Sequence, residues 1–332
     1  MNSYSNRTVL ITGATGLIGS HIVDALMAQE DVRVIALSRS ESKLKSGFSE
    51  YLDHPNFIIA AKDVAEPFDF KEPIDFIFHA AGPMEGKVIK NKPMDVIYPN
   101  LTGTVNCLEF LRKQEHETGV KGRMILFSSV TIYGNNTNRD LTVQEKDTQI
   151  TEVLESGSAP YSQSKRMSEV ITYAFCRQFG VDAVIGRFST VYGNTRFIPD
   201  TAFFEFIKKG INSEDITLNS SGLSRRDNIY IDDAVNGILT IGAKGTTGEA
   251  YNISSNGELS NYASVDEIAQ VIAQTANLRN SEKTVEVNFK SDITGNRKPG
   301  IKLDNTKLKD LGWTLTVSLQ EGIENTMNEF SR

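Results

Sequence analysis

Short apolar runs rich in β-branched residues alternate with amphipathic segments along the first 190 residues of the chain. The runs lie at residues 8–11, 33–37, 57–60, 76–79, 124–127 and 183–187. Segments of helical periodicity separate them, for example residues 17–29 and 94–115. Strands that alternate with helices pair in parallel, and the helices cover both faces of the resulting sheet. The sequence therefore predicts an α/β protein built on a doubly wound parallel sheet.

The alternation weakens after about residue 190. Loops such as residues 219–228 then mix with shorter helices, and an amphipathic segment follows at residues 319–330. We expect residues 1–188 to form the sheet domain, with residues 225–255 returning to it. Residues 189–332 should mainly form a smaller, interleaved C-terminal α/β domain.

Composition excludes several classes of protein. The formal net charge of −7 argues against a nucleic-acid partner, which usually calls for a basic surface. No apolar run approaches the ~20 residues of a membrane helix, and no leader segment precedes the first apolar run. Cys107 and Cys176 lie in apolar helical segments and show no metal-binding spacing. We therefore expect a cytoplasmic protein without a membrane partner, a disulfide or a bound metal.

The first apolar run continues into a turn punctuated by glycines and then into a helix, in the stretch VLITGATGLIGSHIV. Gly13, Gly16 and Gly19 let the backbone approach a pyrophosphate and let the helix pack closely on the strand. The helix N-terminus then faces the negative phosphates. The context of strand, turn and helix predicts a Rossmann-type dinucleotide site. The alternative is a glycine-rich turn without a ligand.

A tyrosine and a lysine stand four residues apart in the stretch SAPYSQSKRMSE. Pro160 suits the first turn of a helix, and Gly180 supplies a stop signal. Tyr161 and Lys165 then share one helix face. A nearby positive charge lowers the pKa of a phenol, so we expect Tyr161 to exchange a proton near neutral pH. The alternative is a solvated helix start without chemistry.

The order of these motifs resembles the extended short-chain dehydrogenases/reductases, in particular the NAD-dependent epimerase/dehydratase family that acts on nucleotide sugars. The resemblance covers nearly the whole chain. It rests on TGATGLIG, Asp63-Val64, HAAG at residues 79–82, NLTGTVNCLEF from Asn100, FSSVTIYG, the Tyr161 and Lys165 pair, GRFSTVYG, RRDNIYIDDAV, YNISS and DLGW, which follow one another as in the family.

The resemblance implies roles for individual residues. Tyr161 is the general acid/base, Lys165 lowers its pKa and holds the nicotinamide ribose, and Ser129 hydrogen-bonds the reacting oxygen. The implied cofactor contacts are Gly13, Thr15, Gly16, Leu17, Ile18, Gly19, Ser38, Arg39, Asp63, Val64, His79, Ala80, Ala81, Gly82, Asn100, Ser128, Tyr161, Lys165 and Arg187. The implied substrate contacts are Pro83, Ser129, Val130, Thr131, Thr190 and Arg226. The alternatives are that Ser129 only caps a strand end and that Lys165 is solvated.

The chain departs from the family at the end of the second apolar run. Members that prefer NAD usually carry an acid there, and this chain has Ser38 followed by Arg39. An arginine suits a 2′-phosphate because it adds charge and bidentate hydrogen bonds. We therefore favour NADP(H), with NAD(H) as the other possibility. The alternative is an arginine that lies over the adenine or in solvent.

A second departure concerns the reaction. Dehydratases and decarboxylases of the family place an acid after the serine or threonine of the fifth strand, where this chain has Val130, Thr131 and Ile132. Elimination needs a second acid and base at neighbouring carbons. The leading hypothesis is an NADP(H)-dependent reductase of a nucleotide-diphosphate 4-keto sugar. The alternatives are a 4-epimerase with bound NAD, a 4,6-dehydratase or decarboxylase served by an acid from residues 145–155, and a cofactor-sensing binding protein.

Three further features leave alternatives open. Thr190 replaces an asparagine that contacts the substrate diphosphate in relatives. Arg226 matches the phosphate-binding arginine of the family, or it forms an ion pair with Asp227 or Asp232. The polar stretch at residues 135–158 either folds over the sugar or makes a surface excursion. The family often forms homodimers through the helices of NLTGTVNCLEF and YSQSK, and we expect the same here.

Overall fold

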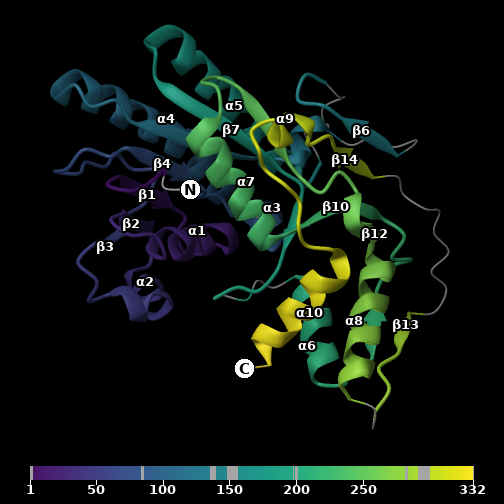
Figure 1. Ribbon diagram of the computed structural model, residues 1–332. Coiled ribbons are helices and arrows are strands. Elements are labelled where there is room, and N and C mark those ends of the chain that lie inside the picture. Colours follow the sequence, from purple (N-terminus) through teal and green to yellow (C-terminus); the bar gives the residue numbers. More distant parts are fainter. Residues whose placement is uncertain are drawn as a thin grey trace.

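The computed structural model describes residues 3–83, 86–134, 140–147, 156–196, 198, 201–280, 283–290 and 300–331. A seven-stranded sheet in the order β11-β7-β5-β4-β1-β2-β3 lies at its centre, and every neighbouring pair is parallel (Figure 1). Its strands are β1 (Thr8–Thr12), β2 (Arg33–Ser38), β3 (Phe57–Ala61), β4 (Phe76–His79), β5 (Arg123–Ser129), β7 (Asp182–Phe188) and β11 (Ala250–Ile253). The predicted α/β class with a doubly wound parallel sheet is confirmed.

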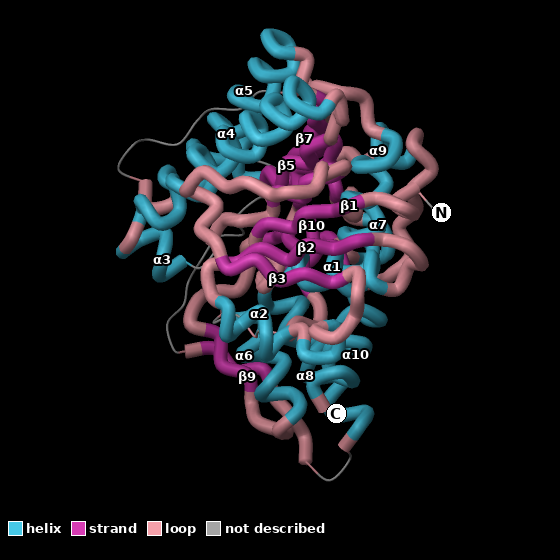
Figure 2. The backbone as a smooth tube through the Cα atoms, turned by 90° about the vertical axis from the view of Figure 1, so that its left-hand side faces the viewer, coloured by secondary structure: helices cyan, strands magenta, loops and turns pink. Residues whose placement is uncertain are grey.

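Helices cover both faces of this sheet (Figures 1 and 2). Alternate residues of a strand point to opposite faces, so β1 serves both layers. Leu10 packs in the core beneath α4 (Pro93–Thr118) and α5 (Ala159–Phe179), whereas Val9 and Ile11 pack with α1 (Leu17–Met27) and α7 (Ile231–Lys244). Burial on both faces explains why the predicted strands are continuous apolar runs rather than alternating ones.

The C-terminal lobe carries the helices α6 (Ala202–Ile211), α8 (Val265–Arg279) and α10 (Leu319–Phe330), which pack side by side below the large sheet (Figure 2). Capping boxes at Ser264 and Ser318 fix the starts of α8 and α10. The short elements are α2 (Glu41–Gly47), α3 (Gly86–Asn91), α9 (Thr306–Lys309) and the 3₁₀ turns η1 (Ser49–Tyr51), η2 (Val130–Tyr133) and η3 (Glu258–Ser260).

Three small sheets accompany the large one within the described residues. Their strand orders are β12-β10-β8, β13-β9 and β14-β6. The strands are β6 (Leu141–Val143), β8 (Thr190–Tyr192), β9 (Ile216–Leu218), β10 (Arg225–Tyr230), β12 (Tyr262–Ser264), β13 (Val287–Phe289) and β14 (Ile301–Leu303).

The two halves of the chain are interleaved. After β7 the chain leaves the large sheet for β8 and α6, and it returns with α7 on one face and β11 at the edge. β10 belongs instead to the three-stranded sheet. The boundary at residue 188 stays a prediction, because sheet membership does not coincide with a single cut in the sequence.

A buried carboxylate holds the C-terminal segment against α7. Asp233 accepts hydrogen bonds from the backbone N–H of Thr316 and of Val317, at 3.1 Å and 2.9 Å, and from the Thr316 hydroxyl at 2.6 Å. The Trp313 indole donates to the Asp233 carbonyl at 3.0 Å. These bonds fix the direction in which the chain enters α10.

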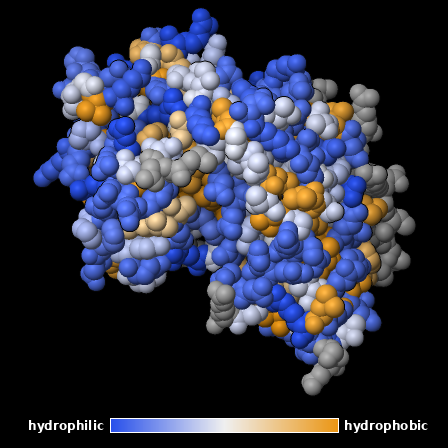
Figure 3. Space-filling view, in the orientation of Figure 1, coloured by the Kyte–Doolittle hydropathy of each residue, from blue (hydrophilic) through white to orange (hydrophobic). Residues whose placement is uncertain are grey.

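The face of the molecule seen in Figure 3 is largely hydrophilic and is indented between the large-sheet lobe and the lobe of α6, α8 and α10. Within the described part of the chain, no helix is both long enough and apolar enough to cross a bilayer.

Candidate active site

The predicted site residues gather at the edge of the sheet where its parallel strands end. Thr12, Ser38, His79, Ser129 and Phe188 are the last residues of β1, β2, β4, β5 and β7. Ligands of open α/β sheets bind outside the carboxyl ends of the strands. The topology alone therefore brings together motifs that lie far apart in the sequence.

The glycine turn after β1 allows close contact between backbone segments. Gly13 has a φ of +68°, and a Cβ there would lie 2.8 Å from Cα of Ala81 in the neighbouring turn. A Cβ at Gly19 would clash with the Gly13 carbonyl. Leu17 and Ile18 are the first residues of α1, so free N–H groups at the start of this helix point to the strand ends. The turn has the form that a pyrophosphate requires.

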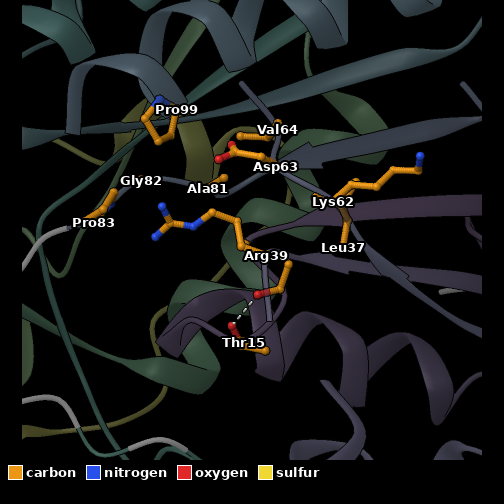
Figure 4. Close-up of a pocket in the computed structure, with 12 residues that line it drawn as sticks. Thr15, Leu37, Arg39, Lys62, Asp63, Val64, Ala81, Gly82, Pro83 and Pro99 are labelled. Atoms are coloured by element: carbon orange, nitrogen blue, oxygen red, sulfur yellow. Dashed lines mark hydrogen bonds between the residues drawn. The ribbon is translucent and has the colours of Figure 1, made fainter. Parts of the chain in front are cut away.

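A pocket of about 150 Å³ adjoins this turn (Figure 4). Nine of its twelve lining residues are predicted cofactor or substrate contacts. The lining consists of Gly13, Thr15, Leu37, Ser38, Arg39, Lys62, Asp63, Val64, Ala81, Gly82, Pro83 and Pro99. Sequence reasoning missed Leu37, Lys62 and Pro99, which are neighbours of predicted residues.

Arg39 is exposed and extends from the end of β2 across the pocket towards Gly82 and Pro83 (Figure 4). Ser38 turns to Thr15 instead, and the two hydroxyls lie 3.0 Å apart. Of the described residues in the lining, Asp63 alone carries a carboxylate, and it follows β3 rather than β2. The direction of Arg39 suits both a contact to a 2′-phosphate and a position over the adenine.

Asp63 is fixed by its own turn, because its Oδ1 accepts from the Ala65 N–H at 2.9 Å. This bond leaves the other carboxylate oxygen available to the pocket. Val64 is buried beside it and packs where Gly103 of α4 comes close to the loop.

His79 is placed behind the site rather than in the pocket lining. Its Nδ1 lies 2.8 Å from the Thr12 hydroxyl, which also accepts from the Ala81 N–H at 3.3 Å. Burial and, to a smaller degree, the charge of Lys165 lower the pKa of His79 to about 3. His79 is therefore neutral and fixes the turn that contains Ala80 and Ala81.

Gly82, Asn100 and Lys165 converge at one point beyond the pocket. A Cβ at Gly82 would lie 2.6 Å from Asn100 Oδ1 and 3.4 Å from Lys165 Nζ. Asn100 Nδ2 donates to Ser164 Oγ at 2.9 Å, whereas its buried Oδ1 has no partner among the described residues. An unpartnered buried acceptor next to a lysine calls for a hydroxyl donor. The glycine turn, the pocket and this acceptor therefore fit a dinucleotide cofactor.

The three predicted catalytic residues lie together. Tyr161 and Lys165 are in the first two turns of α5, both buried, and the Tyr161 phenol hydrogen-bonds Ser129. Lys165 Nζ donates to the Phe127 carbonyl at 2.7 Å and lies 5.9 Å from the centroid of the Tyr161 ring. The hydroxyl of Ser129 also accepts from the Thr131 N–H at 3.3 Å, so this residue both caps η2 and reaches the phenol.

The expected lowering of the phenol pKa by Lys165 is wrong for this structure. Burial raises the pKa of Tyr161 above its ordinary value, and the hydrogen bond with Ser129 offsets only part of the rise. Burial also lowers the pKa of Lys165 to about 8, against the effect of Glu169. The Tyr161 phenol therefore keeps its proton at neutral pH.

Ser128 and Arg187, expected to contact the cofactor, belong here to a buried network. Ser128 Oγ donates to Glu169 Oε1 at 2.5 Å, and Arg187 binds both Glu169 oxygens. Arg187 also donates to the Tyr133 hydroxyl at 2.9 Å. Sequence reasoning missed Glu169, whose only signal is its position four residues after Lys165.

Two of the expected substrate residues directly follow the end of β5. Val130 and Thr131 are half-buried in η2, and Thr131 Oγ1 is a buried atom without a partner among the described residues. Thr190 begins β8 and pairs with Asn228 of β10. Pro83 lines the cofactor pocket at the side of Gly82.

Arg226 is exposed in β10. In the described part of the structure it forms no ion pair with Asp227 or Asp232. Asp227 is buried and accepts from Ser255 Oγ at 2.5 Å and from the Leu303 N–H at 2.9 Å. The guanidinium of Arg226 is thus not held by the two aspartates considered as its partners.

The stretch 135–158 is described only at residues 140–147 and 156–158, so its expected position over the sugar stays a prediction. Within it, β6 pairs with β14 of the C-terminal lobe. Glu145 Oε1 accepts from the Asn252 N–H at 2.8 Å, and its carbonyl accepts from Arg187 at 2.7 Å. Residues 148–155, considered as a source of an acid, lie outside the described residues.

The amino-acid sequence matches known proteins over most of its length. The model of the NAD dependent epimerase/dehydratase family matches residues 9–254. Among curated proteins, UDP-glucuronic acid decarboxylase 5 of Arabidopsis thaliana is 29% identical over 329 residues, which cover 98% of this chain and 90% of that protein.

Solved structures agree in fold. The UDP-glucuronic acid 4-epimerase of Bacillus cereus, in complex with UDP-glucuronic acid and NAD, superimposes with a TM-score of 0.77 at 25% identity, covering 97% of this chain and 98% of that one. The UDP-glucose 4-epimerase of Thermotoga maritima with UDP-glucose gives a TM-score of 0.75 at 25% identity, with the same coverage. From the sequence match and the assembled site together, this chain belongs to the NAD dependent epimerase/dehydratase family and is one of its enzymes.

Proposed function

We propose that the protein is a nucleotide-sugar oxidoreductase that moves a hydride at the 4-position of the sugar, and that it is an NADP(H)-dependent reductase of a nucleotide-diphosphate 4-keto sugar. The observation that carries this proposal is the composition of the site around Ser129. Ser129 and Tyr161 serve one oxygen, and the positions after Ser129 are Val130, Thr131 and Ile132, without a carboxylate.

This set suffices for reduction of a ketone. A nicotinamide dinucleotide held by the glycine turn and the pocket would supply the hydride for the carbonyl carbon. Tyr161 supplies the proton to the oxygen, and its raised pKa keeps that proton in place at neutral pH. Ser129 holds the oxygen. The Lys165 ammonium stabilises the negative charge that forms on the Tyr161 phenolate as the proton leaves. The carbonyl carbon would thus be served by the dinucleotide, and its oxygen by Tyr161 and Ser129.

A second candidate is a 4-epimerase with tightly bound NAD. It uses the same oxygen and the same carbon, with hydride removed and returned on opposite faces of the sugar. The two solved structures described above support it, because one is a UDP-glucose 4-epimerase and the other a UDP-glucuronic acid 4-epimerase. Decarboxylation is supported by the name of the Arabidopsis relative. It is disfavoured here because positions 130–132, directly after Ser129, carry no acid, and because Glu145 accepts from the Asn252 N–H.

The substrate we propose is a nucleotide diphosphate sugar. Both of those solved structures contain UDP-sugars. Arg226 is exposed and not paired to the nearby aspartates, so it is available to a diphosphate. Thr190 at the start of β8 offers a hydroxyl where relatives have an asparagine.

For the cofactor, the structures of the Bacillus cereus UDP-glucuronic acid 4-epimerase in complex with NAD support a nicotinamide dinucleotide. We propose a preference for NADP(H) within that class. Its support is Arg39 in the pocket and the absence of a carboxylate at the end of β2. A carboxylate at that place would repel a 2′-phosphate.

We further propose a cytoplasmic homodimer. Met167, Val170 and Tyr173 follow one another at three-residue spacing on α5, and each is about half exposed. Tyr98 on the neighbouring α4 is 52% exposed as well. An exposed apolar face on two packed helices is the kind of surface that a second copy covers.

The first prediction tests the reaction. Incubation with NADPH and a panel of nucleotide-diphosphate 4-keto hexoses should consume one NADPH for each sugar reduced. A new isomer of unchanged mass, formed without net cofactor use, would favour the epimerase instead. A product lighter by one water or by carbon dioxide would overturn both, and mass spectrometry of the sugar nucleotides separates the three outcomes.

Tyr161→Phe should lower kcat by about 10²–10⁴-fold, because a positioned acid contributes that much. The dissociation constant of the cofactor should hardly change. Lys165→Met should weaken both turnover and cofactor binding. Tyr173→Phe, on an exposed part of the same helix, is the matched control. Wild-type turnover by Tyr161→Phe would show that the proton comes from another group.

Arg39→Ala should weaken NADP(H) binding by roughly 10- to 100-fold, the equivalent of one charge-assisted contact. Binding of NAD(H) should stay near that of the wild type. Calorimetric titration of both cofactors measures the difference, and Arg7→Ala, at the opposite end of the sheet, controls for loss of a surface charge. Equal weakening of the two cofactors, or tighter NAD binding by the wild type, contradicts the assignment.

Light scattering at micromolar concentration should give twice the mass of the chain. Val170→Glu should give the mass of one chain, because it places a charge in the middle of the proposed interface. Leu278→Glu, at an 84% exposed apolar residue on α8, should leave the dimer intact. If the wild-type protein has the mass of one chain, the proposed interface is wrong.

A further inference from the structure

Glu169 is a buried carboxylate one helical turn after Lys165 on α5. It is 5% exposed, and the described part of the chain surrounds it with strong donors. Ser128 Oγ and Arg187 Nε donate to its Oε1 at 2.5 Å and 2.9 Å, and Arg187 Nη2 donates to Oε2 at 2.8 Å. A buried charge with this many hydrogen bonds fixes the relative positions of its own helix and of the strands that supply the donors.

Those partners are the neighbours of the catalytic groups. Residues 127–129 follow one another at the end of β5 and make one contact each with α5. The Phe127 carbonyl accepts from Lys165, the Ser128 hydroxyl donates to Glu169, and the Ser129 hydroxyl bonds the Tyr161 phenol. The contact of Glu169 lies between the other two along the strand, so it sets the register of strand and helix for both.

Arg187 extends the same arrangement to the other side of Ser129. Its Nη1 donates to the Tyr133 hydroxyl at 2.9 Å, and its guanidinium carbon lies 5.1 Å from the centroid of the Tyr133 ring. Tyr133 in turn donates to Asn252 Oδ1 at 2.8 Å. η2, which begins directly after Ser129, is therefore fixed at its far end by the partner of Glu169.

The charge of Glu169 also affects the protonation of Lys165. Burial lowers the pKa of Lys165 to about 8, and Glu169 is the group that opposes this change. The other titratable or charged groups near Lys165 and Glu169 among the described residues are Tyr161 and Arg166 on α5, His79 on β4, Tyr133 on η2, Glu145, and Arg187 on β7. His79 is neutral, and Arg187 reaches Lys165 only through Glu169.

We propose that Glu169 and Arg187 form a positioning pair, which holds the Lys165 ammonium and the Ser129 hydroxyl in place against Tyr161. Neither residue of the pair touches the reacting atoms. The inference rests on the catalytic roles proposed above for Ser129, Tyr161 and Lys165. It adds that the geometry and the charge of that set depend on a carboxylate outside it.

Glu169→Gln is the test, because it keeps the shape of the side chain and removes the charge. The pH titration of Lys165 is followed by NMR of the full chain with ¹³C-labelled lysine, and the signal is identified by its loss in Lys165→Met. The midpoint should fall by roughly one pH unit, since an opposite charge nearby favours the ammonium form. The alkaline limit of cofactor binding and of turnover should move to lower pH by the same amount, with a loss in kcat and little change in KM.

Arg166→Ala is the matched control. Arg166 lies on the solvent side of Glu169, with its Nη1 3.9 Å from Oε2 and its side chain 40% exposed. Its loss should leave the Lys165 midpoint and kcat in place. A wild-type midpoint in folded Glu169→Gln would overturn the proposal, and so would an equal shift in Arg166→Ala.

Glu169→Gln leaves Arg187 without its counter-charge, which can prevent folding. The double variant Glu169→Gln/Arg187→Met removes both charges and keeps the buried volume. A lowered Lys165 midpoint in the folded double variant supports the proposal, and an unchanged one refutes it. Because the NMR titration needs no sugar, failure to find a substrate would refute the proposed function and leave this result in force.

Discussion

The bidentate ion pair between Arg187 and Glu169 is the contact at which the central sheet, the catalytic helix and the segment after η2 meet. Two charges buried together lose most of their hydration, and their mutual attraction compensates only when the geometry is good and the remaining hydrogen-bonding sites are filled. Here Ser128, Tyr133 and the Glu145 carbonyl fill them. The pair contributes mainly to the uniqueness of the arrangement, because any shift of α5 along β5 leaves a charge without a partner. In our proposal, the predicted catalytic residues Ser129, Tyr161 and Lys165 depend on that rigidity.

The dinucleotide end of the molecule depends on a different constraint, the close approach of backbone segments. At Gly13 a side chain is excluded both by φ and by the proximity of Ala81. At Gly82 it is excluded by Asn100. These contacts bring the turns after β1 and β4 close together and leave no room for side chains at Gly13 and Gly82. The binding end is thus shaped by small residues, and the reacting end is shaped by charged ones.

Much of the fold and of the site could be predicted from the sequence. Six strands and the helices α1, α4, α5 and α10 lie where apolar periodicity placed them, with β5 extended by two residues to Ser129. The tyrosine, the lysine and the serine meet because parallel strands end at one edge. The pairing of β6 with β14 could not be predicted, since two three-residue strands about 160 residues apart carry no periodic signal. The direction of the Tyr161 pKa shift could not be predicted from the sequence either. It depends on burial by several elements rather than on the distance between Tyr161 and Lys165.

The interleaved path of the chain has a consequence for synthesis on the ribosome. The edge of β7 is covered only when β11 pairs with it, and 65 residues separate Phe188 from Ile253. At about 5–20 residues per second, those residues take roughly 3–13 seconds to emerge. During that interval the nascent sheet has an unpaired apolar edge and lacks the cover of α7. Non-local pairings of this kind also slow folding. The nascent chain therefore exposes an unpaired strand edge, which can pair with other chains, until its second half has been made.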